Sequence, residues 1–374
     1  MRIFRILLSG APIEDVFIYR TQLYCWTFDQ RLRIYNVSDI EDAIERYEVD
    51  RGPGVCYALF HSRGIGASAR QVMSWRSFSA MPPNYLDPIV IDSESVPYRE
   101  IPARIDADAL LDLLIYYDTL YFATRNGLFV LDLAENRGDF TSIVVPVARI
   151  REACYSTSAG LGAVGASCGP AGLRLLFGGI EVNGSEPPPV KKVSDISIRS
   201  DIGYGSVVNY PSRSEYEFLS GPIIATARGG MLTDVSPSRV LVSSELREST
   251  SAGVTEGEYV LWDRSRLLVF EDEEVWSLSV VRSADVRKLN RRRDVASYGE
   301  LVGRIISVVR IGRSFALESD KALVLISSND HQVVSTGPVI ALRSYPRSHR
   351  YQRLATATSE QGVWMLAVDG GDEA

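Results

Sequence analysis

The sequence predicts an all-β fold in which one small antiparallel sheet is repeated along the chain. Two observations predict it: a turn pattern recurs at similar spacing, and short apolar stretches flank each turn. A third is the scarcity of amphipathic segments of 10–15 residues, which would indicate helices alternating with strands. The chain has 374 residues, of which 45% are hydrophobic, so it can bury a large core.

The recurring turn consists of a small residue, Thr or Ser, a short polar stretch, Gly and an apolar strand. It occurs at residues 123–131, which contain Asn126-Gly127, and again at residues 357–366. Asn-Gly between apolar runs is a strong hairpin signal because both residues tolerate positive φ. A looser copy at residues 166–176 has a turn that contains Gly-Pro. These segments are therefore predicted to be hairpins of one repeated unit.

The spacing of these turns indicates a regular repeat. Gly127 and Gly172 are 45 residues apart, and Gly172 and Gly362 are 190 apart, close to four steps of about 47 residues. Further strand pairs are expected where this step places them or upstream: 23–28 with 32–37, 207–210 with 216–219, 259–262 with 267–270, and 314–317 with 322–326. Residues 55–60 and 71–75 form a less regular candidate pair across a Gly-rich loop.

A period of 45–50 residues built from hairpins is typical of β-propellers, and the chain resembles that broad superfamily over most of its length. The Thr-x-x-Gly-Leu turn that starts at Thr124 is similar to repeats of regulator-type propellers. Trp262-Asp263 matches the dipeptide of WD-repeat blades once. The segment from Thr358 to Trp364 loosely resembles the Asp-box turn of sialidase-like propellers, with Glu360 where Asp is expected.

The resemblance implies one propeller over residues 1–369, made of four-stranded antiparallel sheets. Seven blades fit the repeat, and six or eight remain alternatives. A two-domain all-β sandwich with chance spacing is the alternative architecture.

Three insertions are expected, near residues 38–50, 183–193 and 283–294, with a disordered tail at residues 370–374. The first contains a predicted helix at 38–47, with Ser38 as its N-cap and an apolar stripe. The second contains three consecutive prolines and is expected to be an exposed loop. The third is predicted to be a short basic helix or loop.

Composition favours a cytoplasmic protein. The N-terminal apolar run is broken by Arg5 and followed by Glu14 and Asp15, so no signal peptide is expected. No uncharged apolar run approaches the ~20 residues that span a bilayer, so no membrane contact is expected. The cysteines lack C-x-x-C spacing and are predicted to be reduced, buried thiols: Cys25, Cys56, Cys154 and Cys168.

No catalytic residue, cofactor or metal site is predicted. Residues 160–165 match Gly-x-Gly-x-x-Gly, but Gly169-Pro170 would break the helix that a dinucleotide site needs. This segment is instead predicted to be a Gly-rich strand and turn. The three histidines, His61, His331 and His349, have no metal-ligand spacing.

Charge is distributed unevenly along the chain. The net charge is −7 and the pI is about 5.3, which argues against a surface that coats nucleic acid throughout. Residues 282–353 nevertheless carry a net charge of +8. Only 4 of the 40 basic residues are lysines, as is typical of a bacterial-like, GC-rich genome, so a solvated arginine-rich loop is the alternative interpretation. The candidate partner-binding residues are Arg287, Arg291, Arg292, Arg293, Arg343, Arg347, Arg350, Tyr351 and Arg353.

These features favour a non-catalytic protein-interaction module that acts as a scaffold or regulatory subunit of a larger complex. Its expected partner is another protein with an acidic surface, and nucleic acid is a second possibility. Two alternatives stay open: a hydrolase or lyase with its site at the channel mouth, and a nucleotide or nucleic-acid sensor that uses the arginines.

Overall fold

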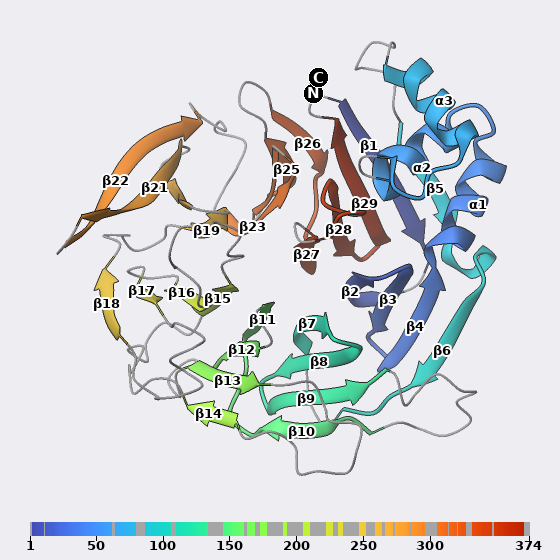
Figure 1. The fold of residues 1–374 in the computed structure, drawn as a ribbon. Coiled ribbons are helices and arrows are strands. Elements are labelled where there is room, and N and C mark those ends of the chain that lie inside the picture. The colour runs from blue at the N-terminus through green and yellow to red at the C-terminus, as the bar shows by residue number, and fades with distance from the viewer. Residues whose placement is uncertain are drawn as a thin grey trace. The chain divides into compact units, whose positions relative to one another are not determined.

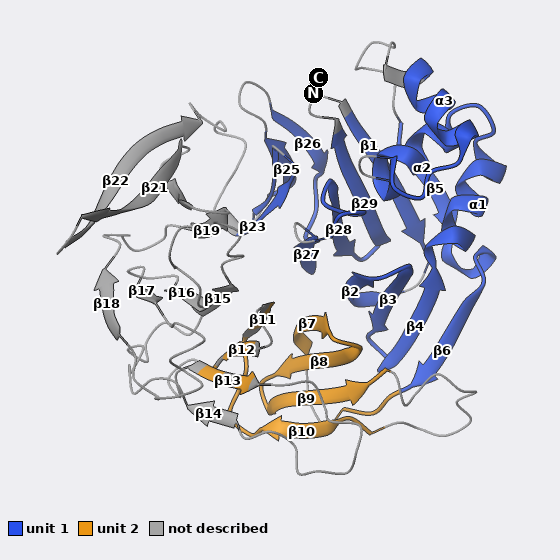
Figure 2. Ribbon diagram, in the orientation of Figure 1, with its two compact units in different colours: residues 1–102, 295–374 blue, residues 103–294 orange. Residues whose placement is uncertain are grey.

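A computed structural model describes the two ends of the chain and part of its middle. The described residues are 2–10, 12–61, 64–79, 87–105, 110–133, 145–160, 163–168, 173–177, 305–312, 314–319, 321–326, 331–345 and 348–369, together with the backbone of strands between 190 and 295. The chain separates into two compact units, residues 1–102 with 295–374 and residues 103–294 (Figure 2).

Unit 1 contains three sheets of similar construction (Figure 1). The first has the order β2 (Ile13–Tyr19), β3 (Gln22–Thr27), β4 (Arg31–Asn36) and β6 (Tyr98–Pro102). The second has the order β23 (Ile305–Ile311), β24 (Ser314–Ser319), β25 (Leu323–Ile326) and β26 (His331–Ser335). In both sheets, neighbouring strands are antiparallel.

The third sheet of unit 1 is assembled from both ends of the chain. Its order is β27 (Ala341–Ser344), β28 (Leu354–Ser359), β29 (Gly362–Asp369), β1 (Arg2–Ser9) and β5 (Ile89–Asp92). β1 and β29 pair antiparallel over their whole length, from Arg2 opposite Asp369 to Ser9 opposite Gly362. β5 joins the other edge of β1 in the parallel direction.

Unit 2 repeats the antiparallel pattern. One sheet contains β7 (Leu110–Tyr116), β8 (Thr119–Thr124), β9 (Gly127–Asp132) and β10 (Val147–Ile150). The next contains β11 (Ser156–Gly160), β12 (Ala163–Ser167), β13 (Leu173–Phe177) and β14 (Val190–Lys192). Further strands are β15 (Gly205–Asn209), β16 (Pro222–Thr226), β17 (Met231–Asp234), β18 (Arg247–Ser251), β19 (Tyr259–Asp263), β20 (Arg266–Glu271), β21 (Glu274–Ser283) and β22 (Val286–Val295).

Most of the predicted hairpins are present. The pairs β3–β4, β8–β9, β12–β13, β19–β20, β24–β25 and β28–β29 confirm the predictions at those places. Of the Gly-rich segment at 160–165, Gly160 ends β11 and residues 163–165 belong to β12, as the predicted strand requires, and the turn at 161–162 lies outside the described residues. The expected pairing of 207–210 with 216–219 is not found: β15 pairs with β16, and residues 216–219 lie outside the described residues. The number of seven blades stays a prediction.

The repeated Thr or Ser of the turn pattern has a specific structural role. The Thr124 hydroxyl donates to the Gly127 carbonyl at 2.9 Å and accepts from the Asn126 N–H at 3.1 Å. Ser359 makes the same two bonds around its own turn, to Gly362 and from Gln361. The side chain thereby satisfies backbone groups that the two-residue turn leaves unpaired.

The glycine of this turn is required for two reasons. Gly127 and Gly362 have φ of +146° and +130°, a region that side-chain-bearing residues rarely adopt. A Cβ at Gly127 would also overlap the carbonyl oxygen of Ile150, and one at Gly362 would overlap that of Leu8. The neighbouring strand therefore approaches the turn closely enough to exclude any side chain.

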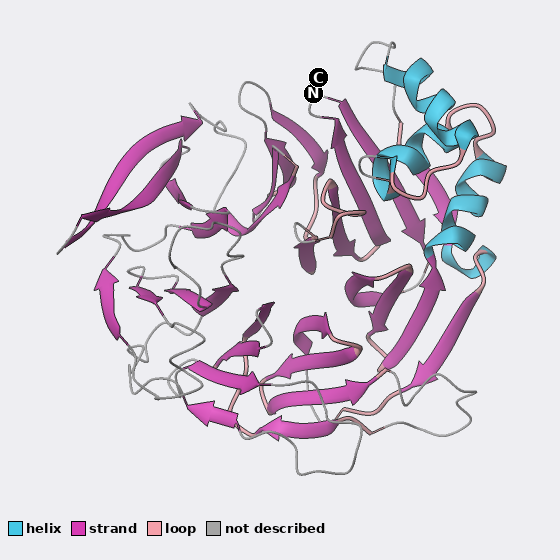
Figure 3. Cartoon of the chain, in the orientation of Figure 1, coloured by secondary structure: helices cyan, strands magenta, loops and turns pink. Residues whose placement is uncertain are grey.

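The insertion between β4 and β6 is helical (Figure 3). It contains α1 (Val37–Tyr47), α2 (Gly52–Phe60), α3 (Ala69–Ser79) and a short 3-10 turn, η2 (Ser93–Ser95). The predicted helix at 38–47 is confirmed, and Ile40, Ala43 and Ile44 are buried along its stripe. Ser38 is not its cap: the N-cap position is Asn36, whose side chain makes no capping bond.

The expected pairing of strands 55–60 and 71–75 is wrong, because these segments belong to α2 and α3. α2 is buried on nearly every side, so its sequence is apolar throughout and lacks helical periodicity. A short apolar run of this kind cannot be assigned to a strand or a helix from periodicity alone. Trp75 is accordingly on a helix, with its ring 5.3 Å from Phe4 and 5.4 Å from Tyr57 between centroids.

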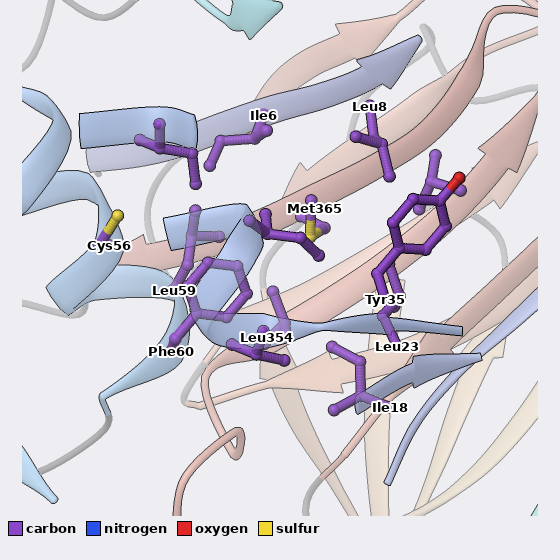
Figure 4. Packing of buried hydrophobic residues seen from close by; sticks show 14 of the residues in the cluster. Ile6, Leu8, Ile18, Leu23, Tyr35, Cys56, Leu59, Phe60, Leu354 and Met365 are labelled. Carbon is purple, nitrogen blue, oxygen red and sulfur yellow. The ribbon is translucent and has the colours of Figure 1, made fainter. Parts of the chain in front are cut away.

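The main core of unit 1 lies between the insertion and two sheets. Leu59 and Phe60 of α2 pack near Leu354 and Met365 of the chain-end sheet (Figure 4). Ile18 and Leu23, from the β2–β3 hairpin, and Tyr35, from β4, belong to the same cluster. This cluster attaches the insertion to the two sheets, because burial of apolar surface contributes about 25 cal/mol per Å².

The other predicted interruptions have different outcomes. Residues 286–295, expected to be a short basic helix or loop, form β22, the fourth strand of the sheet β19-β20-β21-β22. Alternation of apolar and charged residues is weak there, which is why the strand was not predicted. The exposed loop expected at 183–193 is wrong at 190–192, which form β14 paired with β13, and the rest of it lies outside the described residues, as does the tail at 370–374.

Candidate functional site

The structure places four of the nine predicted partner-binding residues on one segment. Arg343 lies on β27, and Arg350, Tyr351 and Arg353 lie on the connection from β27 to β28. Arg347 lies outside the described residues. The other four, Arg287, Arg291, Arg292 and Arg293, are on β22, whose side chains are likewise outside the description.

Arg343 forms a buried ion pair with Asp15 of β2. Its Nε donates to Asp15 Oδ1 at 2.7 Å, and its Nη2 contacts Oδ2, so the guanidinium meets the carboxylate in bidentate fashion. Asp15 Oδ1 also accepts the backbone N–H of Val16 at 2.7 Å. The pair joins the first strands of two neighbouring sheets of unit 1.

Tyr345 reinforces the same junction. Its hydroxyl accepts the backbone N–H of Ile18 at 3.2 Å and lies 2.8 Å from the hydroxyl of Thr356. Its ring meets that of Phe17 edge-on, with centroids 5.5 Å apart. Burial raises the pKa of Tyr345, so its hydroxyl stays protonated and keeps these bonds.

Arg350 joins the β27–β28 connection to the helical insertion. Its Nε donates to the carbonyl of Phe60, the last residue of α2, at 2.9 Å. A cation at this position is stabilised by the partial negative charge of the helix C-terminus. The guanidinium also lies over the ring of Tyr351, 5.4 Å from its centroid, and 3.8 Å from Glu41 Oε1.

Glu41 lies between Arg350 and the imidazole of His61. His61 Nδ1 is 3.0 Å from the Ile65 carbonyl, which can only accept, so Nδ1 carries a hydrogen. His61 Nε2 faces Glu41 Oε1 in this buried geometry. We refer to Glu41, His61, Arg350 and Tyr351 as the insertion latch.

One member of the insertion latch and one neighbouring thiol stay neutral. Burial raises the pKa of Tyr351 to about 12, with its side chain almost fully enclosed. The Cys56 thiol donates to the backbone carbonyl of Glu41 at 3.8 Å, and burial raises its pKa as well. The latch therefore joins the β27–β28 connection to the insertion, with Tyr351 neutral within it and the neutral Cys56 thiol beside it.

The insertion also exposes large apolar side chains. Tyr47 at the end of α1 is 68% exposed and Met73 on α3 is 69% exposed, and Val49 is exposed between them in sequence. Arg70 ties these elements together: its Nη2 donates to the Val49 carbonyl at 3.1 Å, and its Nη1 lies 3.5 Å from Glu45. We refer to Tyr47, Val49, Arg70 and Met73 as the insertion surface.

Sequence reasoning missed a pair of equivalent aspartates. Asp15 and Asp112 each follow a register shift at the start of the first strand of a sheet. Asp112 Oδ2 accepts the backbone N–H of Thr157 at 2.5 Å and its hydroxyl at 2.7 Å, which joins β7 to β11 within unit 2. The signal was present, because residues 15–19 and 112–116 both run from Asp through three apolar residues to Tyr.

The described residues contain no group of three or more His, Cys, Asp and Glu side chains that could hold a metal ion. None of the described helices is both long and apolar enough to cross a membrane.

Comparison with known proteins addresses the fold. No protein-family model and no curated protein sequence matches the chain. Among solved structures it is similar to the β-propeller domain of Cps50 (Swd1) from Myceliophteria thermophila, with 12% identity, a TM-score of 0.57, and 97% of this chain and 98% of that chain covered. It also resembles the extracellular domain of a two-component system from B. thetaiotaomicron, with 10% identity, a TM-score of 0.54, and 100% of this chain and 43% of that chain covered. At such identities the likeness shows the fold alone: the chain is a β-propeller protein.

Proposed function

We propose that this protein is a non-catalytic interaction module that serves as a scaffold or regulatory subunit of a larger complex. The observation that carries the proposal is the insertion surface. Tyr47, Val49 and Met73 expose apolar area next to Arg70, and aromatic, Met and Arg side chains are the residue types enriched at protein interfaces.

The anchoring of the insertion supports the same proposal. Its inner side contributes to the unit 1 core and its orientation is held by the insertion latch. A surface that is rigid before binding loses little conformational entropy when a partner docks, which improves affinity.

The arginines divide into two groups for this proposal. Arg343 and Arg350 contact Asp15 and Glu41 of this chain, so much of their charge is already balanced. We therefore assign the contact with an acidic partner to the β22 arginines, and the segment 343–353 to holding the fold and the insertion. A partner that engages both regions would combine apolar docking with charge complementarity.

The test uses the full chain produced in its native cell. A photo-crosslinking amino acid at position 47 is expected to capture a specific protein, whereas the same probe at position 117 is not. Tyr117 is the matched control because it is a tyrosine of unit 2 with 62% exposure, close to that of Tyr47. Equal capture at both positions, or none at position 47, would contradict the proposal.

The charge contribution is tested separately. Replacing Arg291, Arg292 and Arg293 together with Glu should abolish co-purification of the captured protein while the melting temperature stays unchanged. Retained binding would remove the acidic partner from the proposal. A steep loss of affinity for single-stranded nucleic acid across a salt series would favour the nucleic-acid alternative instead.

A further inference from the structure

Two thiols of unit 2 are in direct contact. Cys154 lies in the connection from β10 to β11, and Cys168 directly follows β12. Their sulfur atoms are 3.4 Å apart and both side chains are buried. Ser156 pairs with Ser167 at the end of the β11–β12 ladder, and the two cysteines lie just beyond that end.

This arrangement approaches the geometry of a disulfide. An S–S bond is about 2.05 Å long, so the sulfurs must move closer by somewhat more than 1 Å. Rotation of the two side chains can supply this movement while the ladder stays intact.

The surroundings distinguish the two sulfurs. The Cys154 thiol can donate its hydrogen to the Cys168 sulfur, and this bond lowers the pKa of Cys168 and raises that of Cys154. Arg174, which forms an ion pair with Glu152 at 2.6 Å, also favours the thiolate form of Cys168. Cys168 is therefore the better nucleophile of the two.

We propose that Cys154 and Cys168 are a redox-active pair that a hydroperoxide converts to a disulfide. The Cys168 thiolate attacks the peroxide oxygen, which breaks the O–O bond and gives a sulfenic acid and an alcohol. The Cys154 sulfur then attacks the Cys168 sulfur, and the hydroxyl group leaves as water with the Cys154 proton. Two thiols and one hydroperoxide become one disulfide, one alcohol and one water.

The disulfide would link two sheets. The backbone N–H of Cys154 donates to the carbonyl of Thr124 on β8 at 2.8 Å, which attaches Cys154 to the sheet of β7 to β10. Cys168 belongs to the sheet of β11 to β14. Oxidation therefore adds a covalent bond between neighbouring sheets of unit 2, beside the hydrogen bonds from Thr157 to Asp112.

The other two cysteines provide internal controls. Cys25 on β3 and Cys56 on α2 are buried, and burial raises the pKa of each thiol. If oxidation proceeds through the folded pair, Cys25 and Cys56 stay reduced. If it proceeds through global unfolding, all four thiols react together.

The experiment treats the full chain with hydrogen peroxide and then alkylates the remaining thiols in denaturant. We expect a peptide pair linked through Cys154 and Cys168, and oxidation of these two thiols more than about tenfold faster than of Cys25 and Cys56. In Cys154→Ser, dimedone should trap a sulfenic acid at Cys168, and in Cys25→Ser the linked pair should form as in the parent. Absence of the linked pair, or equal oxidation of all four cysteines, would overturn the proposal.

Discussion

The hairpins that begin at Asp15 in unit 1 and at Asp112 in unit 2 have the same construction, but their aspartates bind different groups. The Asp15 carboxylate accepts hydrogen bonds from the guanidinium of Arg343, whereas the Asp112 carboxylate accepts hydrogen bonds from the backbone N–H and the hydroxyl of Thr157. In both hairpins a register shift precedes the aspartate. The same strand and register shift therefore place both carboxylates at the edge of their sheets. The neighbouring sheet supplies the partner, which is charged for Asp15 and neutral for Asp112, and this difference sets how much stability each contact contributes.

The largest effect is expected from removing Arg343. Arg343→Ala leaves Asp15 buried without its cation and should cost about 3–5 kcal/mol of unfolding free energy, measured by urea denaturation. The double variant Asp15→Asn with Arg343→Met removes both charges and should recover most of the loss. A loss below about 1 kcal/mol in the single variant would show that Asp15 is solvated and that the two aspartates are equivalent.

Substitutions of the turn glycines test whether, in each unit, the backbone of a neighbouring strand lies close enough to the turn to exclude a side chain. Gly127→Ala and Gly362→Ala should each cost about 3 kcal/mol, because of positive φ and of overlap with a neighbouring carbonyl. Gly337→Ala is the control, since a Cβ there meets nothing within 4 Å. Unequal losses at 127 and 362 would show that the two hairpins differ in their freedom to relax.

The residue before the turn Thr or Ser differs among the hairpins: it is Ala123 before Thr124, Thr358 before Ser359, and Glu318 before Ser319, whose hydroxyl bonds Ala322 in its own turn. Glu318 is 5% exposed, and burial raises its pKa from 4.5 to about 7. The folded state then holds a proton that the unfolded state releases, so stability falls as pH rises from about 4.5 to about 7, by at most about 3 kcal/mol. Glu318→Gln should remove this part of the pH dependence in urea titrations at pH 5 and pH 8. An unchanged pH profile in the variant would contradict the assignment.

The smallest effect is expected at Asp112. Thr157→Val removes the hydroxyl bond and keeps the backbone N–H bond, so the expected loss is about 1 kcal/mol by urea denaturation. A loss of unfolding free energy as large as that of Arg343→Ala would mean that the Thr157–Asp112 contact contributes as much stability as the Arg343–Asp15 ion pair.

The sequence predicted the turns because their chemistry is local. In the turns at 124–127 and 359–362, a Thr or Ser and the Gly three residues later form the two-residue turn, and each capping bond spans two or three residues. The helices α2 and α3 were missed because burial on several sides removes the periodicity that marks a helix. Aligning whole hairpins, and not the turns alone, would have identified Asp15 and Asp112.

The insertion latch could not have been predicted from the sequence. Glu41 and His61 are 20 residues apart, and Arg350 reaches Phe60 across 290 residues. Their proximity follows from how α1, α2 and the β27–β28 connection pack, and no local pattern encodes that packing. No local pattern around His61 indicated its carboxylate neighbour, Glu41.

The chain-end sheet has a consequence for biosynthesis. As the ribosome makes the chain, β1 emerges long before β29, the strand it pairs with along its full length. Until then β1 has β5 on one edge and an unprotected row of amides and carbonyls on the other. A nascent chain stalled before residue 362 would therefore carry an open edge able to recruit a foreign strand, and chaperone binding there would end when the last strand arrives.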